Sequence, residues 1–192
     1  MKKVLFILLI FVSISIFADE ENILDYFPCD RYYTWTYANS RGIIVERRGV
    51  TNNGPKDIII ENQMVGSGSI FTIYNFIDNN VVIRGIQNNI IRTSRIYESP
   101  YPIELSLPGN EWQYTDRGDD LRLRTSRSSC NVDDTIYNDC ILVEEKIVNG
   151  NTTIRTKKSY YARGIGLVLI TLQRGNEVES IYIKLIKHTI NN

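Results

Sequence analysis

The sequence predicts an all-β protein, built as a single antiparallel meander that is strongly twisted and curled into a half-barrel or an irregular barrel. Two observations carry this prediction. Turn-forming residues recur about every ten residues and separate short runs rich in Ile, Val, Thr and Tyr, which is typical of an antiparallel all-β domain. After the N-terminal leader, no stretch shows a long helical period, and residues 20–27 allow one helical turn at most. A meander of about ten or more strands curls or closes because this buries its apolar face and protects its edges.

The expected strands follow one another along the chain, each bounded by turn residues. Their ranges are 32–38, 43–50, 58–65, 70–77, 81–86, 90–97, 111–115, 120–126, 139–148, 152–162, 166–173 and 177–190. Asn149-Gly150 and Gly175-Asn176 supply the positive φ angles that tight hairpin turns need. Residues 152–161 alternate in character along the strand, so we expect one face of such strands to meet a core.

The N-terminus has the pattern of a secretory signal peptide. Lys2 and Lys3 precede an apolar run from Val4 to Ile14, and the small residue Ala18 is followed by acids. The alternative is an uncleaved membrane anchor, but the run is shorter than the ~20 residues that span a bilayer. We therefore expect residues 1–18 to be a signal peptide, residues 19–192 to form a single β-sheet domain, and the mature protein to be exported to the periplasm or the extracellular space. No further transmembrane span is expected.

Charge and composition exclude several classes of partner and cofactor. Lys and Arg number 22 and Asp and Glu number 22, so the formal net charge is zero and nothing suggests binding to nucleic acid. The chain has one histidine, His188, and no Cys-x-x-Cys pair, so a zinc site with ordinary spacing is not expected. We expect no cofactor and no metal.

The three cysteines are Cys29, Cys130 and Cys140. Cys130 and Cys140 flank a turn-rich segment, and a loop of this size can bring two strand ends to the ~5.5 Å Cα separation that a disulfide requires. Since three is an odd number, at least one thiol stays free or pairs between molecules. We expect a Cys130–Cys140 disulfide with Cys29 as a buried free thiol.

Two Trp-x-Tyr pairs form a weak internal repeat. Trp35 and Tyr37 follow Pro28, while Trp112 and Tyr114 follow Pro108. Residues two apart on a strand share a face, so each pair should form one large aromatic patch. Sheet packing is the favoured interpretation, and ligand stacking is the alternative.

The run YYARGIGLV (160–168) poses a question because glycine loops also bind phosphate. Phosphate loops lead into a helix, whereas the residues after Gly166 have the composition of a strand. We therefore interpret the run as a corner between strands, with Tyr160 and Tyr161 on opposite faces. Gly164 and Gly166 would allow positive φ or a close backbone approach.

Three segments carry a resemblance to a group of uncharacterised exported bacterial proteins. That group shares YFPL-x-x-G-x-x-W-x-Y, V-P-A-G-x-F-x-[DN]-C-x-x-V and YYA-x-G-[IV]-G-L-V. Here the first motif is YFPCDRYYTWTY, with Cys29 in place of leucine and Tyr32 in place of glycine. The second is VDDTIYNDCILV, which keeps Asp139 and Cys140 and lacks the Pro-Ala-Gly turn. The third motif is complete.

The resemblance spans most of the mature chain, although residues 51–97 match no motif. It implies an all-β exported protein and supplies no catalytic residue. It also implies a different role for Cys140, because the matching cysteine in that group often occurs alone, as a small buried apolar residue. The disulfide and the lone buried thiol therefore both remain open.

Catalytic constellations are weak in this sequence. His188 lies in the last expected strand and no Gly-x-Ser-x-Gly elbow is present. The remaining candidates are adjacent carboxylates and a run of arginines: Asp119-Asp120, Asp133-Asp134, Glu144-Glu145, and Arg122, Arg124 and Arg127. Glu144 and Glu145 would point to opposite faces of a strand, the Asp pairs suit turns, and the arginines suit a solvated face.

The sequence thus favours an exported, non-enzymatic binding protein of the bacterial cell envelope. Its curved sheet would bind either an apolar ligand such as a lipid or a protein partner such as another envelope protein, and the sequence does not choose between them. The alternative is a hydrolase that uses turn carboxylates such as Asp119, or His188.

Overall fold

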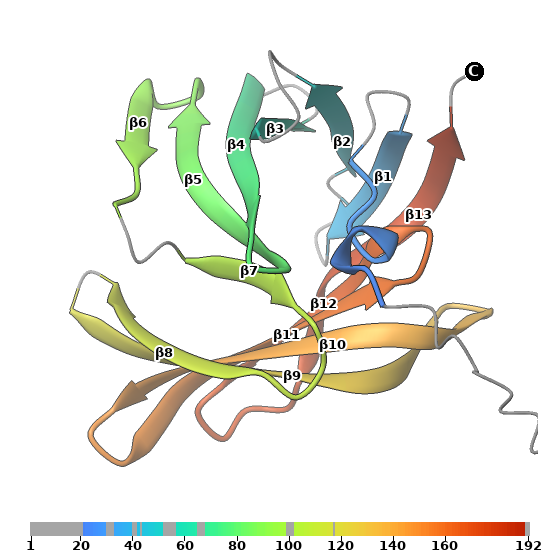
Figure 1. Ribbon diagram of the computed structural model, residues 1–192. Coiled ribbons are helices and arrows are strands. Elements are labelled where there is room, and N and C mark those ends of the chain that lie inside the picture. Colours follow the sequence, from blue (N-terminus) through green and yellow to red (C-terminus); the bar gives the residue numbers. More distant parts are fainter. Residues whose placement is uncertain are drawn as a thin grey trace, which may run out of the picture.

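The computed structural model describes residues 21–29, 33–39, 42, 44–51, 57–64, 68–98, 102–116 and 118–190, so the predicted signal peptide at 1–18 lies outside the described residues. Within these ranges the chain forms one short 3₁₀ turn and thirteen strands (Figure 1). Their bounds are η1 (Ile23–Asp25), β1 (Tyr33–Asn39), β2 (Ile44–Thr51), β3 (Asp57–Met64), β4 (Gly68–Ile77), β5 (Asn80–Asn88), β6 (Thr93–Ile96), β7 (Ile103–Ser106), β8 (Glu111–Asp116), β9 (Asp119–Val132), β10 (Thr135–Asn149), β11 (Thr152–Ala162), β12 (Gly166–Arg174) and β13 (Ser180–Ile190).

The described strands form one antiparallel sheet in the order β6-β5-β4-β3-β2-β1-β13-β12-β11-β10-β9-β8, and β7 pairs with β5 beside β6. The predicted all-β antiparallel meander is therefore confirmed. The sheet is open, with β6 and β8 at its two ends, so it is compatible with a half-barrel and is not a closed barrel. In the middle of the order the first strand pairs with the last, where Trp35 lies opposite His188.

The sheet curls into two layers (Figure 1). Strands β1 to β6 stand side by side in the upper layer, while β8 to β11 run across below them. β13 passes from the lower layer to the upper one, and β7 lies between the layers on the path from β6 to β8. The two ends of the sheet therefore face each other on the same side of the molecule.

A tight reversal at Leu107–Asn110 ties the two ends of the sheet together at one point. The buried Thr125 of β9 donates its backbone N–H to Asn110 O at 2.9 Å and accepts a bond from Gly109 N at 3.0 Å. Its hydroxyl donates to Leu107 O at 2.6 Å. Because β7 enters this reversal and β8 leaves it, the ends of the sheet meet here.

The core lies inside the curl and is rich in aromatic rings. Phe27, which follows η1, packs edge-on against Tyr74 of β4 at 5.0 Å and lies 6.3 Å from Tyr161 of β11. Tyr26, Trp35 and the three rings named above are all buried or nearly so. The N-terminal segment thus fills the space between the two layers.

Two features differ from the predicted strands. β9 and β10 have 14 and 15 residues and continue through the segment expected to be a turn-rich loop, leaving only Asp133 and Asp134 in the turn. Asp133 has φ +50°, a conformation that Asp tolerates better than most residues, so a two-residue turn suffices. β7, between Pro102 and Pro108, was not expected, since flanking prolines are typical of loops.

Candidate functional site

The three motif segments come together in the structure. Tyr26 donates its hydroxyl to Asp139 Oδ1 at 2.8 Å, which joins the first motif to the second. Trp35 Nε1 donates to Ile165 O at 2.6 Å and Tyr37 donates to Leu167 O at 2.9 Å, which joins β1 to the third motif. The motifs therefore hold the N-terminal segment against the corner between β11 and β12.

The two glycines of YYARGIGLV lie in that corner with left-handed backbone. Gly164 has φ +73° and donates its N–H to Asp25 O at 2.6 Å. Gly166 has φ +94°, and a Cβ there would come within 3.3 Å of Pro28 Cδ. A strand follows Gly166 and no helix begins there, so this turn lacks the helix N-terminus of a phosphate loop.

Tyr160 and Tyr161 have different surroundings on β11. Tyr161 is buried and donates to Glu104 Oε1 of β7 at 2.6 Å, which links the two layers of the sheet. Burial raises the pKa of Tyr161 well above its usual value. Tyr160 is half-buried and packs against the edge of the core.

A buried arginine stands among these rings. Arg47 of β2 donates to the Tyr74 hydroxyl at 3.3 Å, and its guanidinium carbon lies 5.5 Å from the Phe27 ring. Burial lowers the pKa of the guanidinium, while the surrounding phenols and the Glu104 carboxyl together raise it above its ordinary value. The charge is therefore retained inside the curl. Arg47 Nε is buried and has no hydrogen-bond partner among the described residues.

The second Trp-x-Tyr pair lies at the free end of the sheet. Trp112 and Tyr114 are on β8, opposite Leu123 and Leu121 of β9, and both are half-buried. Trp112 Nε1 is buried and makes no hydrogen bond among the described residues, whereas Trp35 Nε1 has its acceptor. The two pairs therefore differ: Trp35 and Tyr37 are buried in the core, whereas Trp112 and Tyr114 lie on β8, the last strand in the sheet order.

A groove of about 380 Å³ separates the two ends of the sheet. We call it the seam groove. One wall is β6 with Tyr97, Glu98 and Pro102, and the other is β8; its lining includes Arg95, Ile96, Tyr97, Pro102, Gln113 and Tyr114. Arg95 lies over the Tyr97 ring at 4.4 Å, and Ile96 is 80% exposed. The seam groove thus offers rings, an exposed aliphatic side chain and polar groups along two strands.

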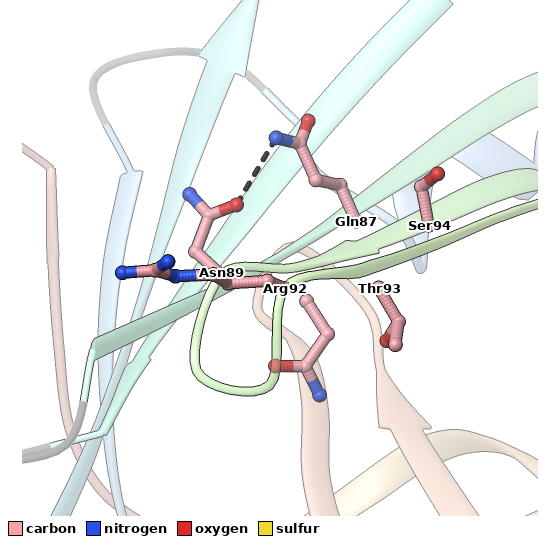
Figure 2. Close-up of a pocket in the computed structure, with 6 residues that line it drawn as sticks. Gln87, Asn89, Arg92, Thr93 and Ser94 are labelled. Carbon is pink, nitrogen blue, oxygen red and sulfur yellow. Dashed lines mark hydrogen bonds between the residues drawn. The ribbon is translucent and has the colours of Figure 1, made fainter.

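A second groove, of about 430 Å³, lies on the β5–β6 hairpin and is shown in Figure 2. Its lining is polar: Gln87, Asn88, Asn89, Arg92, Thr93 and Ser94. Gln87 Nε2 donates to Asn89 Oδ1 at 3.0 Å (Figure 2), and Asn88 Oδ1 accepts from the backbone of Ile90 at 3.0 Å. These hydrogen bonds stabilise the β5–β6 turn, and this structural role explains the polar residues of the groove without a ligand.

The cysteines are free thiols, and two of them are neighbours. Cys130 lies opposite Tyr137, and Cys140 lies opposite Ser128, with one extra residue on β10 between the two pairs. The Cys130 thiol hydrogen-bonds to the Cys140 sulfur, which raises the pKa of Cys130 and lowers that of Cys140. Both are buried, and Cys29 is half-buried.

His188 contacts aromatic rings. Its ring stacks on Tyr33 at 5.5 Å and lies 6.2 Å from Trp35. Burial lowers its pKa, and its Nε2 is buried with no hydrogen-bond partner among the described residues. These contacts hold no carboxylate that would orient a catalytic imidazole.

The carboxylate pairs do not form one cluster. Asp119-Asp120 and Asp133-Asp134 lie at opposite ends of β9, on the order of 40 Å apart for a strand of this length. Glu144 bridges to Arg124 at 3.0 Å, while Glu145 bridges to Lys157 at 3.3 Å. Of the other two arginines in this run, Arg127 binds Asp139 and Glu21, and Arg122 makes no ion pair with any described residue. Within the described ranges no group of three or more His, Cys, Asp or Glu residues is placed to hold a metal ion.

The comparisons with known proteins give no family. No protein-family model matches the chain, and neither curated proteins nor solved structures yield a significant match. Over the described part of the chain, no helix has the length and apolar character to cross a membrane. The candidate site therefore rests on its geometry.

Sequence reasoning singled out Trp112 and Tyr114 as an aromatic patch, with sheet packing favoured, and of the two Tyr114 lines the seam groove. It did not identify Tyr97 and Pro102, which lie in a segment without a recognisable motif. The only available signal was the bulky residues around ESPYP at 98–102, which are typical of any exposed loop.

Proposed function

We propose that this is an exported, non-enzymatic binding protein of the bacterial cell envelope that holds an extended segment of a protein partner in the seam groove. The observation that carries the proposal is the separation of the two sheet ends at β6 and β8, with a groove lined by rings and polar groups between them. The signal-peptide pattern at residues 1–18 supports the export part of this proposal.

A protein segment suits this molecule better than a lipid inside the curl. An apolar ligand needs a cavity of several hundred Å³ with mainly hydrophobic walls. Inside this curl, Phe27, Tyr74 and Tyr161 pack against one another, and the charged Arg47 lies among them. The seam groove lies outside this core and has mixed walls, which are typical of surfaces that bind peptides.

A binding role is also favoured over hydrolysis. The described contacts of His188 are with Tyr33 and Trp35, and the two Asp pairs are far apart along β9. A catalytic base needs its partner within hydrogen-bond reach.

The test uses a displayed library of random linear octapeptides, selected on the purified mature protein. Ile96→Ser removes an aliphatic side chain from the seam groove, and Val178→Ser is the matched control because Val178 is 89% exposed on the β12–β13 connection. Selected peptides should bind Ile96→Ser about tenfold more weakly, the loss expected for one contact of about 1.4 kcal/mol, and should bind Val178→Ser as they bind the unaltered protein.

Failure to enrich any peptide, or equal binding to Ile96→Ser, would overturn the proposal. Native mass spectrometry of freshly purified protein checks the competing ligand class. A co-purifying lipid would identify a carrier in place of a peptide binder.

A further inference from the structure

We infer that the bound segment adds to the sheet as a new strand, pairing its backbone with the free edge of β8. This inference rests on the proposed function and specifies how the seam groove recognises its partner. In strand addition the backbone supplies affinity and alternate side chains supply specificity.

The backbone groups available on β8 follow from its pairing with β9. Thr125 N–H donates to Asn110 O and Thr125 O accepts from Gly109 N, so Asn110 occupies the hydrogen-bonded position opposite Thr125 and Gly109 is an extra, bulged residue. In an antiparallel ladder such pairs alternate with non-bonded ones. The bonded pairs that follow therefore involve Trp112 and Tyr114, opposite Leu123 and Leu121.

The remaining residues of β8 direct their backbone groups away from β9. These are Glu111, Gln113 and Thr115, and β8 is the last strand in the sheet order, so no described strand pairs with them. Their side chains are exposed, and Gln113 also lines the seam groove. Three N–H groups and three carbonyls thus face the position where a partner strand would lie.

β8 has little of the usual protection of a sheet edge. Natural edges are blunted by bulges, prolines, charged side chains or very short strands, and the charged residues of β8, Glu111 and Asp116, stand only at its two ends. β8 pairs with β9 from Glu111 to Asp116 without a register shift, and it contains neither proline nor lysine. The other edge, β6, has four residues against six in β8, so β8 is the longer template.

The seam groove between the two layers limits the length and shape of the bound peptide segment. The ends of the sheet meet at Leu107–Asn110 and separate toward Tyr97 and Tyr114, and an extended strand of about six residues, roughly 20 Å long, would match the six-residue β8 in length. On such a strand, alternate side chains would face Trp112 and Tyr114, where apolar and aromatic residues pack well. The partner is therefore an extended peptide segment with alternating apolar residues and no proline where its N–H meets β8.

The test uses one selected octapeptide, synthesised with a single N-methyl group at each position in turn. An N-methyl group removes one backbone donor and leaves the side chain unchanged. Methylation at alternate residues should weaken binding at least tenfold, and methylation at the intervening residues should weaken it less than threefold.

A protein variant tests the same contact from the other side. Gln113→Pro removes an outward N–H, and proline is tolerated on the solvent side of an edge strand. Binding should fall at least tenfold in Gln113→Pro, whereas Gln113→Ala, which removes only the side chain, should cost less than threefold. Circular dichroism and thermal melting of both variants should match the unaltered protein.

The outcomes separate this inference from the proposed function. If every N-methyl position is tolerated while Ile96→Ser still weakens binding, the groove binds peptides by side chains alone and strand addition is wrong. If the peptide is insensitive to Ile96→Ser, the proposed function itself is wrong. Should Gln113→Pro fail to fold, the N-methyl series still decides between these outcomes.

Discussion

Oxidation should join Cys130 to Cys140 and leave Cys29 free. The two thiols already hydrogen-bond to each other on paired strands, and both are buried side chains of the β9–β10 hairpin. Because an extra residue on β10 separates Tyr137 from Cys140, the two cysteines are diagonal neighbours on the hairpin. In an oxidising compartment a thiol–disulfide oxidoreductase can form this bond without rebuilding the hairpin.

The loop closed by this bond sets the size of the effect. For about ten residues the chain-entropy model gives a stabilisation of about 2.7 kcal/mol, which arises from restriction of the unfolded chain. In a domain of this size 1 kcal/mol shifts the melting temperature by about 2–4 °C, so the oxidised protein should melt about 5–10 °C above the reduced one.

The assay is thermal melting with and without reductant, together with mass mapping of unreduced tryptic peptides. In the control variant Cys29→Ala the difference between oxidised and reduced protein should persist, while Cys130→Ala should abolish it. A Cys29 peptide linked to either partner would refute the reasoning. So would alkylation of all three thiols in the absence of reductant.

Two further perturbations test the corner and the buried phenols. Gly166→Ala should lower the free energy of unfolding by about 2–3 kcal/mol, because φ is +94° and the new Cβ would lie 3.3 Å from Pro28 Cδ. Gly164→Ala should lower it by about 1 kcal/mol, because φ is +73° and the space around the new Cβ is open. Denaturant unfolding measures both losses, and equal losses would contradict this account. Burial raises the pKa of Tyr37 to about 12, whereas the phenol of the unfolded chain titrates near pH ~10. Below pH ~10 both states hold the proton, and the buried neutral phenol makes its full contribution to the free energy of unfolding. Between pH ~10 and 12 the folded protein keeps a proton that the unfolded chain has lost. The stability that Tyr37 contributes should therefore fall by about 2–3 kcal/mol over that window, and Tyr37→Phe should reduce the slope by that share while other buried phenols such as Tyr161 keep the rest; an unchanged slope in Tyr37→Phe would show that Tyr37 does not carry the effect.

Local signals in the sequence were enough to predict the architecture. Alternation and turn residues such as Asn149-Gly150 are short-range features, and the resulting all-β antiparallel sheet is confirmed. The extent of individual strands was less predictable. β9 and β10 continue past their predicted limits, and Cys130 and Val132 in that segment are buried in the core, which its turn-rich composition does not reveal.

The candidate site was less accessible to sequence reasoning because its parts are distant in the chain. Trp112 and Tyr114 formed a visible pattern, but a pattern on one strand does not indicate which segment lies opposite. Tyr97 and Pro102 reach the groove only through the curl of the whole sheet. The buried Arg47 was equally hidden, since an arginine in a strand is more often exposed than buried.

The pairing of β1 with β13 has a consequence for how the chain is made. During synthesis β1 is the first of the described strands to leave the ribosome and β13 is the last. The edge of β1 that pairs with β13 therefore stays unpaired until β13 has been made. Strands β1 to β5 and β8 to β12 can each pair locally in the meantime, as two separate meanders. A polypeptide that ended before Ser180 would leave β1 and β12 each with one unpaired edge, and β13 pairs with both of these edges in the full sheet. β13 (Ser180–Ile190), with its eleven residues, therefore joins the two half-sheets into one continuous sheet.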